Sequence, residues 1–413
     1  MHETIPRPPE PDTPALPWVL RPLFKHLNHI EHGRLLITGP GGTRLELAGT
    51  TSPGLAGELR IHHPYRFMLR LLRGSLGFGE GYLASDWTSP DLPDLLRLLA
   101  RNERAWSGGR KQPLHPLAFL DRIRHRRNRN TRRGSRHNIR DHYDLGVDFF
   151  KPWLDPTLTY SCAHFGTETD DLETAQRHKH RHALDRLDAR PHQTLLEIGS
   201  GFGALAFAAA ARGLSVESLT LSRSQLDYAR AETEKRGLKD RVHFDFLDYR
   251  DLLGTYDHIV SIEMFEAVGE HYWPDFFGTL RSHLNPGGQV ALQVIVIAPD
   301  AFEAYRRHPD FIQLHVFPGG MLPTFAHLET LATRSGFRIV EPTFHGADYA
   351  RTLRCWLQRF DEAWPKLAAA GYPERLRRLW RYYFAYCIAG FEVKRVDVVQ
   401  LTLVPSGRPP VSL

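Results

Sequence analysis

The segment Leu195-Leu-Glu-Ile-Gly-Ser-Gly-Phe-Gly203 decides how the rest of this 413-residue chain is interpreted. Its apolar beginning predicts a buried strand, and the alanine-rich stretch that starts at Ala204 predicts a helix. Between the two, Gly199, Gly201 and Gly203 permit a tight turn and let the backbone approach a ligand closely. A strand, a glycine-rich turn and a helix in this order indicate a ligand-binding turn of an α/β fold.

Two cofactors compete for this turn on the pattern alone. The run Gly199-Ser-Gly-Phe-Gly-Ala204 fits the G-x-G-x-x-A variant that holds the pyrophosphate of a dinucleotide. Glu197, however, lies at the end of the predicted strand, where its carboxylate would repel a pyrophosphate but could pair with the α-amino group of a methionine moiety. We therefore favour S-adenosylmethionine over a dinucleotide, and we rank a purely structural glycine turn below both.

Strands and helices alternate around this turn. The predicted strands are Thr194–Glu197, Ser215–Thr220, Val242–Phe246, Tyr256–Ile262 and Gln289–Ile297. Helices are predicted to begin at Ala204 and Ser224 and to lie around Trp273–Leu284, and Asn285-Pro-Gly-Gly288 is predicted to turn into the fifth strand. Alternation at this spacing predicts an α/β fold, a doubly wound, mostly parallel Rossmann-like sheet with helices on both faces.

We divide the chain into four segments. A Pro-rich tail covers 1–20 and is expected to be disordered; a small α+β domain covers 21–107; a basic, Arg-rich linker covers 108–140; and the larger α/β domain covers 141–413. In the small domain, Gly33–Leu47 predicts two strands around a glycine turn, Gly57–His62 a third strand, and Tyr65–Asn102 a helical stretch.

The composition is that of an ordinary globular protein, with 42% hydrophobic residues. The longest strongly apolar run, Val290–Ala298, is far shorter than the roughly 20 residues of a bilayer-spanning helix. No basic segment leads into an apolar one at the N-terminus, so we expect a cytoplasmic protein without a secretory signal. The scattered cysteines argue against a disulfide framework and a zinc site, and we assign no metal.

Arginines crowd the stretch from Arg122 to Arg136, although the formal net charge of the chain is only +6. Such a run attracts phosphates, either of a nucleic acid or of anionic lipid headgroups, and a solvated linker is an equal interpretation. A short amphipathic helix with Leu117, Leu120 and Ile123 precedes it and would pack on its own domain or contact a membrane.

Several motifs give the chain a specific resemblance. His142-Tyr-Asp-Leu-Gly-Val-Asp-Phe-Phe150 and Leu154-Asp-Pro-Thr-Leu-Thr-Tyr-Ser-Cys-Ala163 closely resemble the opening of cyclopropane-fatty-acid synthases and the related mycolic acid and fatty-acid methyltransferases. The likeness continues in the same order through Ser261-Ile-Glu-Met-Phe-Glu-Ala-Val-Gly269, Phe317-Pro-Gly-Gly-Met-Leu-Pro323, Gly346-Ala-Asp-Tyr-Ala-Arg-Thr-Leu353 and Tyr386-Cys-Ile-Ala-Gly-Phe391. Leu76-Gly-Phe-Gly-Glu-Gly-Tyr82 resembles the accessory domain of the bacterial synthases, so the likeness covers nearly everything after residue 25.

The resemblance implies which residues contact S-adenosylmethionine. They lie on the loops after the predicted strands and on the opening segment: Tyr160, Ser161, Glu197, Gly199, Gly201, Gly203, Thr220, Leu221, Gln225, Tyr249 and Arg250.

The resemblance also implies a catalytic site. In the family a bicarbonate ion lies beside the reacting carbon and serves as base; its ligands here would be Cys162, Glu266 and Tyr349. Gln293 stands where the best-matching bacterial synthase has a histidine, and glutamine donates a hydrogen bond but cannot titrate. Cys387 matches a cysteine traditionally marked as catalytic. Without the resemblance, these would be interpreted as packing or structural residues.

The implied activity is transfer of the methyl group of S-adenosylmethionine to the cis double bond of an unsaturated phospholipid acyl chain, with proton loss closing a cyclopropane ring. A hydride shift before proton loss would instead give a methylene branch, which a partner reductase could convert to a methyl branch. We expect peripheral binding to the anionic inner membrane face and no nucleic acid as partner; a homodimer stays open. A dehydrogenase of the NAD type and a nucleic-acid-binding module are the remaining alternatives.

Overall fold

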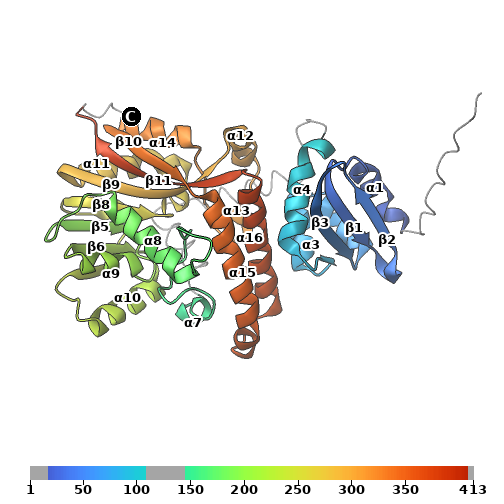
Figure 1. The fold of residues 1–413 in the computed structure, drawn as a ribbon, viewed down its shortest axis with the longest axis horizontal. Coiled ribbons are helices and arrows are strands. Elements are labelled where there is room, and N and C mark those ends of the chain that lie inside the picture. The colour runs from blue at the N-terminus through green and yellow to red at the C-terminus, as the bar shows by residue number, and fades with distance from the viewer. Residues whose placement is uncertain (1–16, 108–144, 408–413) are drawn as a thin grey trace, which may run out of the picture. The chain divides into compact units, whose positions relative to one another are not determined.

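The computed structural model describes residues 17–107 and 145–407 (Figure 1). The first sixteen residues and the segment that holds the arginine run and its predicted amphipathic helix lie outside the described residues. The chain divides into two compact units, Met1–Pro116 with Arg378–Tyr382, and Leu117–Arg377 with Tyr383–Leu413.

The first unit is a small α+β fold. Its four-stranded sheet has the order β2-β1-β3-β4, with β1 parallel to β3 and antiparallel to β2. The strands expected over Gly33–Leu47 are confirmed, and the third strand begins earlier than predicted. The strand bounds are β1 His32–Thr38, β2 Arg44–Ala48, β3 Thr51–Ile61 and β4 Trp87–Thr88.

Helices pack around this small sheet. The stretch predicted to be helical over Tyr65–Asn102 is divided into three helices with β4 between the last two. The helix bounds are α1 Arg21–Leu27, α2 Pro64–Leu71, α3 Gly74–Leu83 and α4 Leu92–Ser107. The predicted end of the tail at residue 20 is wrong, because Trp18–Leu20 form a 3₁₀ turn whose Leu20 is fully buried.

The second unit is built on a seven-stranded sheet with the order β10-β11-β9-β8-β5-β6-β7. Strands β5 to β9 run parallel to one another, whereas β11 lies between β9 and β10 and is antiparallel to both. The bounds are β5 Thr194–Ile198, β6 Ser215–Thr220, β7 Val242–Phe246, β8 Tyr256–Ile262, β9 Leu284–Ile297, β10 Phe337–Phe344 and β11 Val396–Pro405.

The sequence predicted the five parallel strands within a few residues, with one exception. Asn285–Gly288, predicted as a turn, lies inside β9, where the register against β8 shifts. A Cβ atom at Gly288 would lie 2.3 Å from the carbonyl oxygen of Asp257, so only glycine allows this close approach. The prediction of a turn was therefore wrong, and the two antiparallel strands at the C-terminal side were not predicted.

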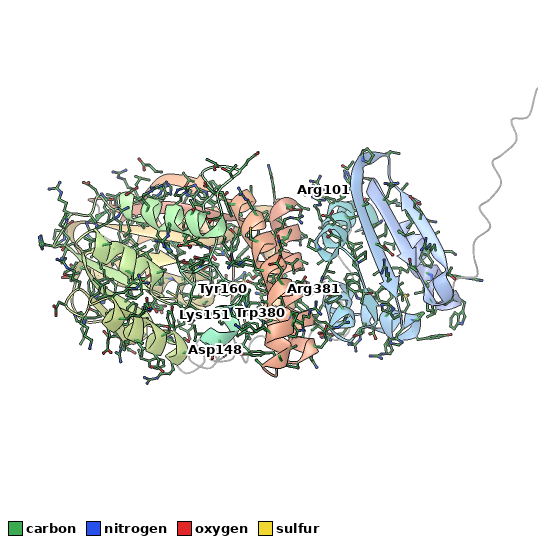
Figure 2. The ribbon with its side chains drawn as sticks, turned by 60° about the horizontal axis from the view of Figure 1, so that its bottom comes forward. Arg101, Asp148, Lys151, Tyr160, Trp380 and Arg381 are labelled. Atoms are coloured by element: carbon green, nitrogen blue, oxygen red, sulfur yellow. The ribbon has the colours of Figure 1, made fainter. Side chains whose placement is uncertain are left out.

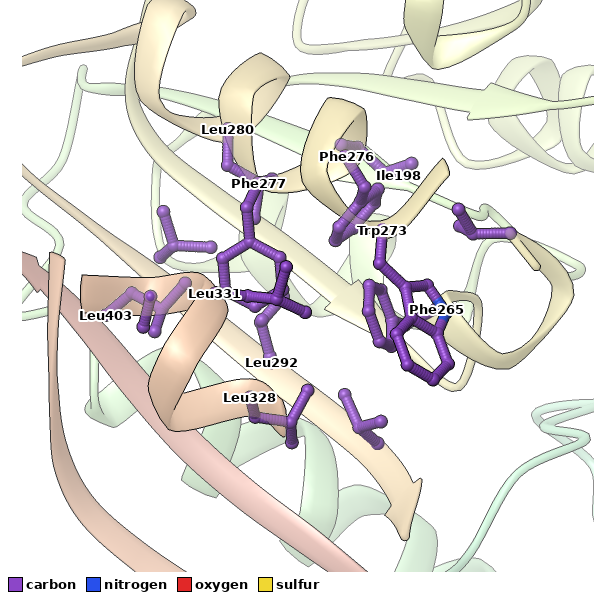
Figure 3. Close-up of a cluster of buried hydrophobic side chains, with 14 of the residues drawn as sticks. Ile198, Phe265, Trp273, Phe276, Phe277, Leu280, Leu292, Leu328, Leu331 and Leu403 are labelled. Atoms are coloured by element: carbon purple, nitrogen blue, oxygen red, sulfur yellow. The ribbon is translucent and has the colours of Figure 1, made fainter. Parts of the chain in front are cut away.

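Helices cover both faces of the seven-stranded sheet, as predicted. On one face α8, α9 and α10 bury Leu184, Leu205 and Leu226 against β5 to β7. On the other, α11 and α14 pack Phe277 and Leu328 against β9 and β11 (Figure 3). The helix bounds are α7 Val147–Phe150, α8 Leu172–Asp185, α9 Ala204–Ala211, α10 Arg223–Lys235, α11 Trp273–Ser282, α12 Pro299–Arg307, α13 Phe311–His315, α14 Phe325–Arg334, α15 Gly346–Ala369 and α16 Glu374–Glu392.

Side-chain caps fix where several of these helices begin. Asp171 accepts the backbone N–H of Thr174 at the start of α8, and Thr324 and Asp310 form capping boxes at α14 and α13. None of the described helices combines the length and the apolar character that crossing a membrane requires.

Candidate active site

The strand order reverses between β5 and β8, and this switch point brings two carboxylates to the same edge of the sheet. Glu197 is the second-to-last residue of β5, and Glu263 follows the last residue of β8. Open α/β sheets bind ligands in the crevice beyond such a point, because the connecting helices leave in opposite directions. The site is therefore built outward from these two strand ends.

The three glycines after β5 have different roles. All have a left-handed φ, of +96° at Gly199, +49° at Gly201 and +92° at Gly203. A Cβ atom at Gly203 would lie 2.9 Å from the ring of Phe244, and at Gly199 3.2 Å from the side chain of Met264, so these two allow close packing. At Gly201 a Cβ atom would meet nothing within 4 Å. This turn thus exposes backbone to open space where a ligand would approach.

Glu197 has the environment expected of a partner for an ammonium group. Its side chain is buried and accepts a hydrogen bond from Ser218 Oγ (2.5 Å). Burial raises the pKa of Glu197 to about 8, against the opposing effects of Ser218 and Lys179. A cationic amino group brought beside it would favour the charged carboxylate. With the open backbone at Gly201, these residues fit the methionine end of S-adenosylmethionine.

The loop after β6 is held in one shape by its own side chains. Thr220 Oγ1 donates to Gln225 Oε1 (3.0 Å) and accepts the backbone N–H of Ser222 (3.0 Å). Ser222 then caps α10 by accepting the N–H of Gln225 (3.3 Å), which leaves the half-buried Leu221 at the bend. This loop lies beside the glycine turn, because β6 pairs with β5.

The turn after β7 holds Tyr249 and Arg250, the last two residues predicted to contact the cofactor. The ring of Tyr249 packs in the core 5.3 Å from that of Phe276, so its side chain belongs to the core. The guanidinium of Arg250 is held by Asp248, with Nη2 2.6 Å from Oδ2 and Nε 2.8 Å from Oδ1. The Tyr249 ring is therefore turned into the core, and a contact with the cofactor at this residue would have to come from its backbone.

Tyr160 and Ser161 lie on the loop that follows α7 (Figure 2). The Tyr160 hydroxyl donates to that of Tyr383 (3.0 Å). Ser161 Oγ accepts a hydrogen bond from Lys179 Nζ (2.6 Å), and this lysine is almost fully buried. Burial lowers the pKa of Lys179 to about 8, although nearby carboxylates, Glu263 above all, favour its charge. A buried cation therefore lies among the acidic groups of the site.

Three of the predicted catalytic residues meet at Glu263, a residue that the sequence analysis did not select. Glu263 Oε1 accepts the backbone N–H of Cys162 (2.8 Å) and Nε2 of Gln293 (2.6 Å). Its Oε2 accepts the hydroxyl of Tyr349 (2.6 Å). Cys162, Gln293 and Tyr349 thus surround a carboxylate of the chain itself. Glu263 was present in the quoted motif Ser261–Gly269, but nothing in the pattern indicated where its side chain points.

A chain of hydrogen bonds fixes the orientation of Gln293. Its Oε1 accepts Nε2 of Gln400 (2.9 Å), so its own Nε2 must be the atom that donates to Glu263. Gln400 Oε1 in turn lies 2.5 Å from Nδ1 of His182, which acts as the donor there. The chain therefore presents an N–H group, and not an acceptor, to the Glu263 carboxylate.

His182 also belongs to a group of three histidines. Ring nitrogens of His164, His182 and His345 lie within 4.8 Å of one another. His345 contacts Asp348 Oδ2 (3.1 Å) and Thr343 Oγ1 (2.9 Å) through its two nitrogens, so protein groups occupy both. Burial and the neighbouring histidines lower the pKa of His164 to about 4, which keeps that ring neutral. We interpret the group as packing support for the Gln400–Gln293 chain.

Glu266 and Cys387 occupy different surroundings from the other three predicted catalytic residues. Glu266 Oε1 accepts the backbone N–H of Ile295, and its buried Oε2 has no hydrogen-bond partner among the described residues. Burial, and next the charge of Glu263, raise the pKa of Glu266 to about 8. Cys387 lies on α16, where burial and then Asp310 raise the pKa of its thiol. A neutral thiol is a weak nucleophile.

Cys162 contributes its backbone and not its sulfur to this arrangement. Its Sγ donates to the carbonyl of Ala163 (3.1 Å) and lies 3.7 Å from that of His345, and burial raises the pKa of the thiol well above its usual range.

We therefore expect Cys162→Ala to keep turnover within about threefold, because the N–H that reaches Glu263 remains. The variant should lose about 1 kcal/mol of stability, because the hydrogen bond of the thiol is lost. Steady-state kinetics and thermal unfolding measure both; a hundredfold loss of turnover would show that the sulfur takes part in the reaction.

The strand order, counted from β5, is 3-2-1-4-5-7-6 with an antiparallel seventh strand, and the glycine turn follows the first strand at the switch point. These features define the class I S-adenosylmethionine-dependent methyltransferase fold. Residues 130–401 match the family model for mycolic acid cyclopropane synthetase. The chain belongs to this family and is an S-adenosylmethionine-dependent methyltransferase.

Individual relatives agree with this assignment. Tuberculostearic acid methyltransferase UfaA1 of Mycobacterium tuberculosis is 38% identical over 92% of this chain and 89% of its own length. Cyclopropane-fatty-acyl-phospholipid synthase of Escherichia coli is 33% identical over 86% of this chain and 90% of its own. A solved structure of mycolic acid cyclopropane synthase CmaA1, complexed with SAH and CTAB, has a TM-score of 0.61 at 28% identity and covers 65% of this chain and 97% of that one.

Proposed function

We propose that this enzyme transfers the methyl group of S-adenosylmethionine to the cis double bond of an unsaturated fatty acyl chain of a phospholipid, and that proton loss then closes a cyclopropane ring. The observation that carries the proposal is the carboxylate of the half-buried Glu263, which accepts three hydrogen bonds beside the glycine turn. An alkene has no acidic hydrogen before methylation, so a proton acceptor is needed only after the methyl group has been added. Methyl transfer to nitrogen or oxygen removes a proton from the heteroatom and does not break a C–H bond.

The proposed cofactor fits the site. Bound at the glycine turn, S-adenosylmethionine supplies an electrophilic methyl group. Glu197 and the exposed backbone at Gly201 would hold its methionine end, and the loops after β6 and β7 its remaining parts. The related structure with SAH, the demethylated form of this cofactor, and with CTAB, an amphiphile with a long alkyl chain, supports the same pair of ligands for this chain.

Aromatic side chains lie around the proposed reaction site. The ring of Tyr349 packs 4.6 Å from that of Phe391, and the ring of Phe317 5.9 Å from that of Tyr383. Methyl addition leaves a positive charge on the acyl chain, and the faces of such rings attract a cation. They also exclude water, which would otherwise trap the cation as an alcohol.

A methylene branch, convertible to a methyl branch by a partner reductase, is the second candidate product. It is favoured by the 38% identity to a tuberculostearic acid methyltransferase over 92% of this chain.

The test of both products is to incubate the purified enzyme with labelled S-adenosylmethionine and vesicles of unsaturated phospholipid. Ring and methylene products have the same mass, so ozonolysis before mass spectrometry distinguishes them, because ozone cleaves the methylene group and leaves the ring. Absence of label from the acyl chains would reject both.

Exposed apolar side chains in the first unit support contact with a lipid surface. Tyr65, Leu69 and Leu72, at helical spacing on and just after α2, are 62%, 68% and 68% exposed, and Trp18 is 68% exposed. We refer to these four residues as the α2 apolar patch. Exposed apolar clusters of this kind bind membranes or partners, and the acyl chains of the proposed substrate lie in a membrane. The arginine run, which lies outside the described residues, would add attraction to anionic headgroups.

We expect Leu69→Glu with Leu72→Glu to lower turnover on anionic vesicles by about tenfold or more, because burying each leucine in lipid contributes roughly 1.5–3 kcal/mol. Affinity for S-adenosylmethionine should not change. Vesicle sedimentation and calorimetry measure the two effects. Leu253→Glu is the control, since Leu253 is 85% exposed in the other unit. If the double variant sediments with vesicles as the wild type does, the α2 apolar patch does not contact the membrane.

A further inference from the structure

We propose that the carboxylate of Glu263 is the general base of this enzyme, standing where the family resemblance places a bicarbonate ion, so that the reaction needs no dissolved ion. This inference rests on the proposed function, since it concerns the proton that is lost after methyl addition. It assigns a catalytic role to a residue that the resemblance did not select.

The donors expected to hold bicarbonate are already engaged. The backbone N–H of Cys162, the amide of Gln293 and the hydroxyl of Tyr349 all donate to Glu263, at 2.8, 2.6 and 2.6 Å. Bicarbonate and a carboxylate present the same planar pair of oxygens to such donors, so one replaces the other. An additional ion would have to displace the side chain and would bring a second negative charge beside it. The residues present therefore do not fit bicarbonate.

The carboxylate retains an acceptor position for a proton. Two carboxylate oxygens offer about four lone-pair sites. The described donors use two on Oε1 and one on Oε2. One site on Oε2 is left to accept a proton while all three hydrogen bonds persist. The same donors fix the plane of the carboxylate, which is the positioning that efficient proton transfer requires.

The backbone at Glu263 is also unusual. Its φ is +50°, in the left-handed region that a side chain with a Cβ atom rarely adopts. Such strain persists where the surrounding structure enforces it and is concentrated at functional sites. Here the N–H of Glu263 donates to the carbonyl of Gln293 (2.8 Å), so the strained residue is anchored to β9 beside its own side-chain donor. In this conformation the carboxylate accepts hydrogen bonds from Cys162 and Tyr349.

The electrostatic surroundings suit a base. Burial raises the pKa of Glu263, whereas its hydrogen bonds to Tyr349, Cys162 and Gln293 and the charge of Lys179 oppose that rise. A carboxylate with a raised pKa binds a proton more strongly than one in water and still ionises when cationic and N–H groups face it. Burial and the charge of Glu263 raise the pKa of Glu266 to about 8, so that acid holds its proton near neutral pH.

The reaction balances with Glu263 as acceptor. The π electrons of the double bond form the new bond to the methyl carbon, the sulfur–methyl bond breaks, and its electrons stay on the departing sulfur. The neighbouring chain carbon is left positively charged. Glu263 then takes a proton from the new methyl group, and the electrons of that C–H bond form the third side of the ring. The product is neutral, and the protonated carboxyl later releases its proton to solvent.

The test uses the full-length enzyme with vesicles of unsaturated phospholipid and labelled S-adenosylmethionine. Wild-type turnover should be the same in bicarbonate-free buffer and with added bicarbonate. Glu263→Gln keeps the shape but cannot accept the proton; turnover should fall about 10²–10⁴-fold while cofactor affinity changes little. A wild-type enzyme that needs bicarbonate, or a folded Glu263→Gln enzyme with near-normal turnover, would overturn the proposal.

Removal of the side chain gives a second, independent test. Glu263→Gly opens the space between the three donors and relieves the left-handed backbone, so bicarbonate should restore part of its turnover. Bicarbonate should also raise the unfolding temperature of this variant but not of the wild type, because a ligand stabilises the state that binds it. A folded Glu263→Gly enzyme that bicarbonate neither stabilises nor activates contradicts the placement of the carboxylate. Glu341→Gly is the matched control, since exposed Glu341 has a φ of +49°.

These outcomes separate the inference from the function on which it rests. If the wild type labels no acyl chain in any buffer, the proposed function fails. If it labels acyl chains but only with bicarbonate present, the function stands and the role of Glu263 fails.

Discussion

Gly201→Asp should abolish measurable binding of S-adenosylmethionine and leave the protein folded. The φ of Gly201 is +49°, a conformation that aspartate tolerates better than most residues, and a Cβ atom there meets nothing within 4 Å. The new carboxylate would project into the space proposed for the methionine end, whose own carboxylate it would repel. Like charges at such distances cost several kcal/mol, so we expect affinity to fall by about a hundredfold or more.

Calorimetry with S-adenosylmethionine measures this effect, and circular dichroism checks the fold. Gly237→Asp is the matched control, because Gly237 has a φ of +67° with open space around it at the far end of α10. The control should lose similar stability and no affinity. Equal affinity in Gly201→Asp and the wild type would place the cofactor away from this turn.

Most of the parallel sheet could be predicted from the sequence because each of its strands is a short apolar run that ends in a polar or glycine-rich turn. Tyr256–Ile262 and Ser215–Thr220 coincide with the observed β8 and β6. The beginning of β9 was harder to predict, since Gly287 and Gly288 indicate a turn. In the structure they lie in a strand whose register shifts against β8. The close approach of Gly288 to the backbone of Asp257 is a tertiary contact that no local pattern contains.

Only part of the candidate site could be predicted, because only part of it lies in local patterns of strand and turn. Glu197 and the glycines follow a recognisable strand, so their place at the sheet edge could be inferred. The meeting of Cys162, Gln293 and Tyr349 could be inferred only through the family resemblance, since they come from a loop, a strand and a helix far apart in sequence. Glu263 and Glu266 stand three residues apart, and sequence alone could not show which carboxylate faces these donors. In the structure it is Glu263, which has a left-handed φ directly after β8 ends, whose carboxylate accepts all three hydrogen bonds.

Tyr349→Phe should lower turnover by about 10–100-fold and move the acid side of the pH–rate profile to higher pH. The hydroxyl of Tyr349 donates to Glu263 Oε2 (2.6 Å) and lowers the pKa of that carboxyl against the larger effect of burial. Without it the pKa of Glu263 rises further. Because the base must be ionised, the variant loses activity at a higher pH than the wild type as the pH falls. A merely structural tyrosine would lower activity equally at every pH.

Tyr256→Phe is the matched control for this shift. The hydroxyl of Tyr256 also donates to a glutamate, Glu217 Oε2 at 2.6 Å, but from the first residue of β8, at the other end of the strand from Glu263. Its loss should leave the pH dependence of turnover unchanged. Measuring kcat from acid to alkaline pH for the wild type and both variants tests the assignment: a Tyr349→Phe profile that keeps its wild-type midpoint would mean that the carboxylate bonded to Tyr349 is not the group whose ionisation limits the reaction. In that case the hydrogen bond between Tyr349 and Glu263 would only hold α15 against the end of β8, because Tyr349 lies in the first turn of that helix.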